Sequence, residues 1–218
     1  MKQRVWDLPT RLFHWSLVIL VALAWWSAEQ GLDDVHLWVG YAVLFLLLFR
    51  IGWGFIGSST ARFAAFVRGP KAIAHYVRDR FHWPFPGHAP LGAWSVVALL
   101  MLLLIVVGTG LFALDQDGLF GGPLAHLVTI GASDIAYQLH VELFNVLLAL
   151  IALHVTAILL YRILLGRNLL GPMISGKAEL EPGVEPMRPA SLGAALVCAV
   201  VALALTAWII AGAPPFGS

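Results

Sequence analysis

Eight histidines occur in a chain of 218 residues that is 60% hydrophobic and only 11% charged. Four of them fall in strongly apolar stretches: His14, His36, His140 and His154. Ionisable side chains inside a membrane span are costly, so they usually face the interior of a helix bundle and mark function. One such histidine alone is explained at least as well by a hydrogen-bonded core residue as by a ligand. Four together need a common explanation.

The spacing between His140 and His154 is the most informative. The two residues are 14 positions apart. At about 100° and 1.5 Å per residue, an α-helix brings both side chains to one face, about 21 Å apart along its axis. One imidazole then lies near each side of a membrane. Two cofactors stacked across a bilayer require this arrangement.

Five stretches have the length and composition of membrane-spanning helices, which need about 20 mostly apolar residues. They lie near residues 12–28, 36–57, 91–113, 140–164 and 190–211. This composition excludes a soluble globular enzyme. The net charge of +1 gives no basic excess of the kind that nucleic-acid binding needs, and the single cysteine, Cys198, excludes disulfides and cysteine-based zinc sites.

The basic residues predict the orientation, because Lys and Arg near the spans stay on the cytoplasmic side. With the N-terminus inside, all 13 Lys and Arg residues fall in cytoplasmic segments or at the inner ends of spans. The predicted outer segments carry acidic residues instead: Glu29, Asp33, Asp34, Asp115, Asp117 and Asp134. We therefore expect a multi-pass membrane protein with its N-terminus inside and its C-terminus outside.

This topology pairs the four histidines by depth. The first span runs outward, which places His14 near the inner face, and the second runs inward from His36 at the outer face. The fourth also runs inward, so His140 lies outside and His154 lies deeper inside. His14 is thus paired with His154, and His36 with His140.

Each pair has the chemistry of a heme site. Two neutral imidazoles that face each other from different helices of an apolar bundle can ligate a heme iron axially. Zinc or copper sites need three or four ligands, or cysteines and carboxylates nearby, and only Glu142 is close in the sequence. Heme is the better interpretation, with one inner and one outer site.

Two residues of the second span are further candidates for cofactor contacts. Gly40 follows His36 by four residues, so its missing side chain leaves room for a porphyrin against the backbone. Arg50 follows His36 by 14 residues and points to the same face at the inner end of the span. It either pairs with a heme propionate or extends to the inner membrane surface.

The other histidines give weaker signals. His88 lies at the inner start of the third span and is a candidate contact for a propionate or a quinone. His75 and His82 lie among arginines and aromatic residues, where a solvated or lipid-facing role is expected. His126 also precedes His140 by 14 residues, but glycines separate the two, so we treat that spacing as coincidence.

The segments between the spans carry signals of their own. Residues 58–90 mix aromatic with basic side chains, which predicts a helix at the membrane surface, interrupted at Gly69-Pro70. Residues 114–139 are rich in glycine and are expected to pack as a cap over the bundle. Residues 179–189 hold three prolines and read as an extended linker. The last span has neither histidine nor charge and is expected to be a packing or anchoring helix.

Several motifs resemble the bacterial cytochrome b561 and nickel-iron hydrogenase b-type cytochrome family. They are VWDLPTRLFHW at residues 5–15, HLWVGY at 36–41, LFRIGWGFIG at 48–57, GHAPLG at 87–92, and the pairs Leu139-His140 and Leu153-His154. The resemblance runs to about Gly176. It implies a four-helix diheme core, in residues 1–176, that exchanges electrons with membrane quinone, and it assigns its ligands to His14, His36, His140 and His154. Residues 177–218 then form the linker and a fifth transmembrane helix.

The sequence therefore predicts an all-α membrane protein of the bacterial inner membrane, a four-helix diheme bundle plus a fifth C-terminal helix. Its expected cofactors are two heme b groups, with quinone or quinol as substrate. The expected partner is a periplasmic c-type cytochrome or a hydrogenase-like dehydrogenase, and a homodimer is left open. Two alternatives also stay open: a stand-alone quinone oxidoreductase acting on a small oxidant such as superoxide, and a non-heme metal transporter.

Overall fold

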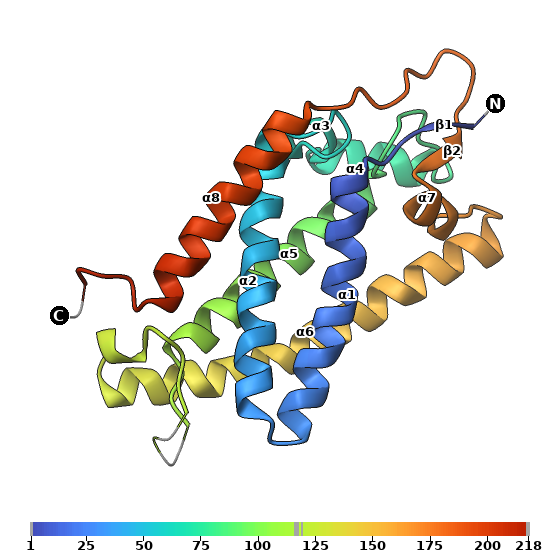
Figure 1. Ribbon diagram of the computed structural model, residues 1–218. Helices are drawn as coiled ribbons and strands as arrows, with labels where there is room; N and C mark the ends of the chain where they lie inside the picture. The colour runs from blue at the N-terminus through green and yellow to red at the C-terminus, as the bar shows by residue number, and fades with distance from the viewer. Residues whose placement is uncertain (1, 116–117, 119, 217–218) are drawn as a thin grey trace. The chain divides into compact units, whose positions relative to one another are not determined.

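The computed structural model describes residues 2–115, 118 and 120–216, and it shows an all-α membrane protein (Figure 1). Among the described residues, five helices are long and apolar enough to cross a membrane. They are α1 (Leu8–Glu29), α2 (Asp33–Ile56), α5 (Pro90–Phe112), α6 (Ile130–Leu164) and α8 (Leu192–Ile210). The five predicted spans are thereby confirmed as helices.

Shorter elements precede α1 or lie in the connections between these helices. They are β1 (Lys2–Arg4), α3 (Phe63–Phe66), α4 (Pro70–Arg78), η1 (Ala125–Leu127), α7 (Leu170–Ser175) and β2 (Lys177–Glu179). The Gly69-Pro70 interruption is confirmed, since Gly69 caps α4 and Pro70 is its first residue. Proline suits this position because its missing N–H has no helical partner there.

Helix α6 has 35 residues and begins ten residues before the predicted start of the fourth span. Thr129 explains the difference. Its hydroxyl accepts a hydrogen bond from the Ala132 N–H at 3.3 Å, which satisfies one of the free donors at the helix start. Gly131, which favoured a loop in the sequence, lies in the first turn of the helix.

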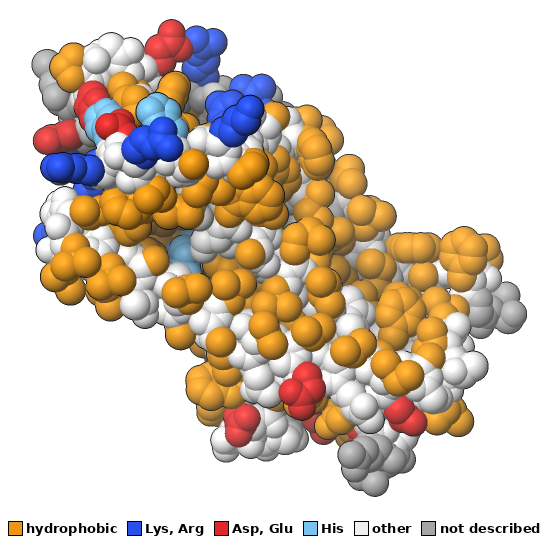
Figure 2. Space-filling model, turned by 180° about the vertical axis from the view of Figure 1, so that it is seen from behind, with side chains coloured by type: hydrophobic (Ala, Val, Ile, Leu, Met, Phe, Trp, Pro, Cys, Tyr) orange, Lys and Arg blue, Asp and Glu red, His pale blue; other side chains and the backbone are white. Residues whose placement is uncertain are grey.

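The chain divides into two compact units, each built from several segments. Unit 1 comprises Met1–His14, Arg50–Ala98 and Ala152–Cys198, and unit 2 comprises Trp15–Phe49, Leu99–Ile151 and Ala199–Ser218. By sequence, all 13 Lys and Arg residues belong to unit 1, whereas seven of the 12 Asp and Glu residues belong to unit 2. Figure 2 shows Lys and Arg gathered together on the visible face, while hydrophobic side chains cover much of it.

In unit 1, a buried carboxylate organises the start of α1. Asp7 accepts hydrogen bonds from the Thr10 N–H at 2.6 Å and from the Trp53 indole N–H at 3.1 Å. It also accepts one from the Ser58 hydroxyl. The first bond caps α1, and the other two tie it to the end of α2 and the residues that follow.

The segment before α8 is extended only in part, because it makes a turn between Glu181 and Val184, and it is hydrogen-bonded to the rest of unit 1. Strand β2 pairs with β1 in an antiparallel register. Further along, the Met187 N–H donates to the Arg4 carbonyl at 3.0 Å, and the Arg188 N–H donates to the Ser59 hydroxyl at 2.9 Å. The N-terminal residues are therefore fixed by a segment more than 170 positions away.

In unit 2, the glycine-rich segment after α5 folds back onto the end of that helix. The Gly122 N–H donates to the Ala113 carbonyl at 2.8 Å, and the Leu124 N–H donates to the Leu111 carbonyl at 2.9 Å. A Cβ at Gly122 would collide with backbone atoms of Gly110 and Leu111. The part of the predicted cap before α6 therefore packs against the end of α5, whereas residues 130–139 of that segment belong to α6 instead. Asp117 lies outside the described residues.

Candidate functional site

The imidazoles of His36 and His140 lie together in unit 2. His36 comes from α2 and His140 from α6. Their ring centroids are 5.9 Å apart, and their planes are almost perpendicular, at 88°. Two imidazoles bound to one metal ion through nitrogens about 2.0 Å away have centroids about 6 Å apart. The separation would therefore suit two imidazoles that hold one metal ion between them.

Hydrogen bonds to backbone carbonyls set the tautomer of both rings. His36 Nδ1 donates to the Ala24 carbonyl at 2.9 Å, and His140 Nδ1 donates to the Val106 carbonyl at 2.8 Å. A carbonyl oxygen only accepts, so Nδ1 must carry the proton in each ring. The unprotonated nitrogen is then Nε2. Metal-binding histidines are commonly oriented in this way by the other ring nitrogen.

Both rings line a cavity of about 520 Å³ in unit 2. This volume lies within the range of about 300–1,000 Å³ that is typical of cofactor and ligand sites. Gly40 also lines the cavity, and a Cβ built there would meet no atom within 4 Å among the described residues outside its own stretch of helix. The space beside Gly40 is therefore large enough for a planar group to lie against the backbone of α2.

Gly110 is a site residue that the sequence analysis missed. It lies on α5, lines the same cavity, and packs against the ring of His140. A Cβ at this position would lie 2.8 Å from both Cε1 and Nδ1 of His140. The available signal was the pair of glycines in Gly108-Thr109-Gly110 inside an otherwise bulky span. Only the second of them touches the histidine.

In unit 1, His14 and His154 lie close enough to His88 to influence its ionisation. Burial, which is the largest cause, and the charges of Arg50, His154 and His14 together lower the pKa of His88 to about 3. Ser95 on α5 lies 3.3 Å from His154, measured from Oγ to Nδ1. His14, His154 and Arg50 thus all lie near His88.

His88 is held by aromatic rings. Its centroid lies 4.6 Å from that of Trp6 and 4.8 Å from that of Phe66. Its Nδ1 is buried and has no hydrogen-bond partner in the part of the chain that the structure describes. At neutral pH this ring is uncharged, so it can bind a ligand through a hydrogen bond but holds a proton only weakly.

Arg50 is buried, with 2% of its surface exposed. Its guanidinium lies over the ring of Phe63, 4.8 Å from the centroid, and Nη1 has no hydrogen-bond partner among the described residues. An arginine that extends to the membrane surface would have its head group in water. A buried guanidinium needs an anionic or carbonyl acceptor instead, and a propionate would provide one.

The donor set fits heme better than a bare metal ion. No group of three or more His, Cys, Asp or Glu side chains that could hold a metal ion occurs among the residues described. The histidine pair across a cavity, the open space at Gly40 and the orphaned N–H of Arg50 all suit heme. Of the remaining histidines, His126 is exposed in η1, and His82 lies 3.6 Å from Glu181.

Comparison with known proteins identifies the family. The family model described as prokaryotic cytochrome b561 matches residues 5–176. No curated protein and no solved structure matches the chain. Because the match covers most of the 218 residues, and because the helices have the required architecture, this chain belongs to the prokaryotic cytochrome b561 family of electron-transferring membrane b-type cytochromes.

Proposed function

We propose that the protein is a diheme b-type cytochrome of the bacterial inner membrane. It exchanges electrons between the quinone pool and a redox partner on the periplasmic face, such as a c-type cytochrome or a hydrogenase-like dehydrogenase. The orientation of this proposal has the N-terminus in the cytoplasm. This orientation is supported by the basic residues, because it places every Lys and Arg on the cytoplasmic side of the membrane.

The observation that carries the proposal is the histidine pair of unit 2. Family membership implies heme b, and His36 and His140 line a cavity of suitable size with Nε2 as their free nitrogen. Heme b, when bound, supplies a one-electron redox centre. In this proposal, His36 and His140 ligate its iron, Gly40 makes room for its ring, and Gly110 keeps His140 in place.

The second site of the proposal lies in unit 1. His14 and His154 are its ligands, and the orphaned N–H of Arg50 pairs with a propionate. His88 borders a cavity of about 450 Å³ together with Phe66 and Trp83. We assign the quinone head group to this cavity, where the neutral His88 acts as a hydrogen-bond partner.

The experiment that tests the proposal is a heme count on the purified full-length protein, with reduced-minus-oxidised spectra. We expect two heme b groups per chain, both reducible by a quinol analogue. A well-folded but colourless protein would contradict the heme sites. A protein with both hemes that no quinol reduces would contradict the quinone assignment alone.

A further inference from the structure

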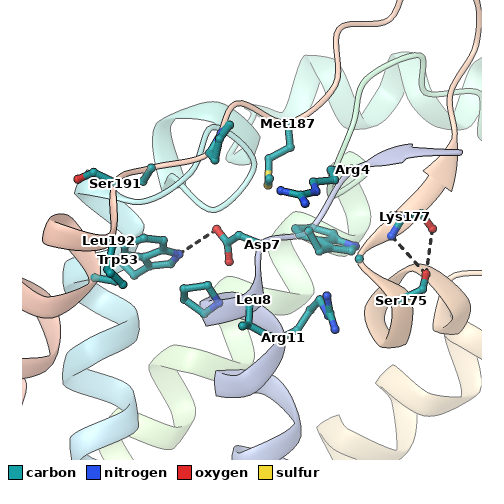
Figure 3. A pocket seen from close by; sticks show the side chains of 16 residues that line it. Arg4, Asp7, Leu8, Arg11, Trp53, Ser175, Lys177, Met187, Ser191 and Leu192 are labelled. Atoms are coloured by element: carbon teal, nitrogen blue, oxygen red, sulfur yellow. Dashed lines mark hydrogen bonds between the residues drawn. The ribbon is translucent and has the colours of Figure 1, made fainter.

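A cavity of about 510 Å³ lies in unit 1 beside β1, the first turn of α1, the end of α7 and the start of α8 (Figure 3). Three cationic residues line it: Arg4, Arg11 and Lys177. Much of the remaining wall is apolar and includes Trp6, Met187 and Leu192. The cavity therefore combines positive charge with a surface that suits hydrocarbon.

Two of these cations oppose each other across a strand pair. In the register of β1 and β2, Arg4 lies directly opposite Lys177, whereas Lys2 lies opposite Glu179. Directly opposed residues of two strands project from the same face, and like charges in such a pair destabilise it. An anion bound between Arg4 and Lys177 would offset this repulsion.

The three cations have no carboxylate within ion-pair distance in the described ranges of the chain. The Nε of Arg11 is buried there without a hydrogen-bond partner. Arg11 lies against Gly176, where a Cβ would come within 2.6 Å of its Nη1. Asp7 also lines the cavity, but its oxygens already accept hydrogen bonds from Thr10, Trp53 and Ser58.

The position of the cavity indicates the kind of anion. It lies where two candidate spans begin, α1 at Leu8 and α8 at Leu192. The starts of spans lie at the membrane interface, and the free N–H groups of helix starts favour negative charge. Basic pockets of this kind beside transmembrane helices suit phospholipid head groups.

We propose that this cavity binds the phosphate head group of an anionic phospholipid, which Arg4, Arg11 and Lys177 recognise. One acyl chain then lies along the apolar wall formed by Leu8, Leu192 and Ala195. Such a lipid joins the N-terminal strand to the start of the fifth helix. This binding site is independent of heme and quinone.

Native mass spectrometry of the delipidated full-length protein tests the proposal. The protein is titrated with phosphatidylglycerol and with phosphatidylcholine that carries the same acyl chains. We expect one phosphatidylglycerol to bind at least roughly tenfold more tightly. Removing two of the cations in the double variant R4Q/K177Q should weaken its binding by roughly 10- to 30-fold.

The matched control is the double variant K71Q/R78Q, which removes the same charge from the exposed surface of α4 and should leave binding within about twofold of wild type. Heme content and helicity show whether each variant is folded. If R4Q/K177Q does not fold, photoreactive phosphatidylglycerol in phosphatidylcholine vesicles should label peptides containing residues 4–11 and 175–192 of the wild-type protein.

Four results would overturn the proposal. The first is equal binding of the two lipids, and the second is unchanged binding by R4Q/K177Q. The third is displacement of the lipid by millimolar inorganic phosphate, which would show a site for a small free anion. Loss of a quinone from the purified double variant, with no loss of lipid, would reassign the cavity to quinone.

Discussion

The two units surround their histidines in different ways. In unit 2, His36 and His140 lie across a cavity, and backbone carbonyls hold both rings. In unit 1, the region around His14 and His154 also contains a third imidazole, that of the partly buried His88, and the buried Arg50. The site of unit 2 is thus defined by the fixed orientation of its two histidines. The site of unit 1 is defined by the charged and polar groups around its histidines. We therefore expect geometric changes to affect unit 2 most, and charge changes to affect unit 1 most.

The largest expected effect comes from removing the histidines themselves. His36→Ala and His140→Ala should each abolish the same heme, and His14→Ala and His154→Ala should each abolish the other, because a bis-histidine site needs both axial ligands. Each variant should retain roughly half of the wild-type heme. Spectra and redox titrations of the four variants should therefore fall into two classes.

His126→Ala is the control for this series, since His126 is exposed in η1, and it should keep both hemes. Grouping of His14 with His140 would contradict the depth pairing. A wild-type protein with a single heme would contradict the proposal of two heme sites.

The next largest effect tests the close packing in unit 2. Gly110→Ala should displace the ring of His140, because the added Cβ would lie 2.8 Å from two of its atoms. We expect loss of most of the outer heme, with the inner heme unchanged. Gly108→Ala adds the same methyl group two residues earlier, where no atom lies within 4 Å. Equal heme content in the two variants would show that Gly110 does not position His140.

A third variant tests whether a flat cofactor occupies the space beside Gly40. Gly40→Leu meets open space at its Cβ, and leucine favours a helix over glycine. The protein alone should therefore tolerate the change, whereas a bound porphyrin would be displaced. We expect outer-heme occupancy to fall several-fold while the thermal stability of heme-free protein stays level or rises. Gly108→Leu is the matched control, and full heme content in Gly40→Leu would argue against contact with the ring.

A smaller effect is expected from the buried arginine of unit 1. Arg50→Leu removes a positive charge beside the proposed propionate, so the potential of the inner heme should fall by tens of millivolts; about 59 mV corresponds to a tenfold change for a one-electron couple. The outer heme should titrate as in wild type. Arg162→Leu removes a charge from an exposed position of α6 and serves as the control. An unchanged inner potential would show that Arg50 does not contact a propionate.

The smallest effect is expected from single cysteines that report orientation. Arg62→Cys, in the loop near Ser59, should resist an impermeant thiol reagent in intact cells, because the basic loops of unit 1 are expected in the cytoplasm. Phe120→Cys, in a segment that is expected outside, should react. Neither change should alter the spectra. Wild-type protein, whose Cys198 is buried, supplies the background. The reverse labelling would invert the topology of the proposal.

Long, regular features of the fold were predictable from the sequence. The five apolar helices follow from composition, and the break at Gly69-Pro70 follows from proline chemistry. Depth matching predicted His36 and His140 as one pair, and their rings lie 5.9 Å apart. Heme ligation by either pair stays a prediction.

Features that depend on distant residues were not predictable. Strands β1 and β2 have three residues each and are separated by most of the chain, so neither shows a periodic pattern. Asp7 lies near charged N-terminal residues in the sequence, where exposure to solvent is expected. It is buried, because Trp53 and Ser58, which are about 50 positions away, donate hydrogen bonds to it. Gly110 matters only because α6 places His140 against it.

The pairing of β1 with β2 has a consequence for the order of biogenesis. Lys177, the partner of Arg4 in the register, leaves the ribosome 173 residues after it. At about 5–20 residues per second, synthesis of that interval takes roughly 10 to 35 seconds. Helix α1 must therefore enter the membrane before β2, the partner of β1, has been synthesised. Unit 1 is completed only after its last segment, Ala152–Cys198, has been synthesised.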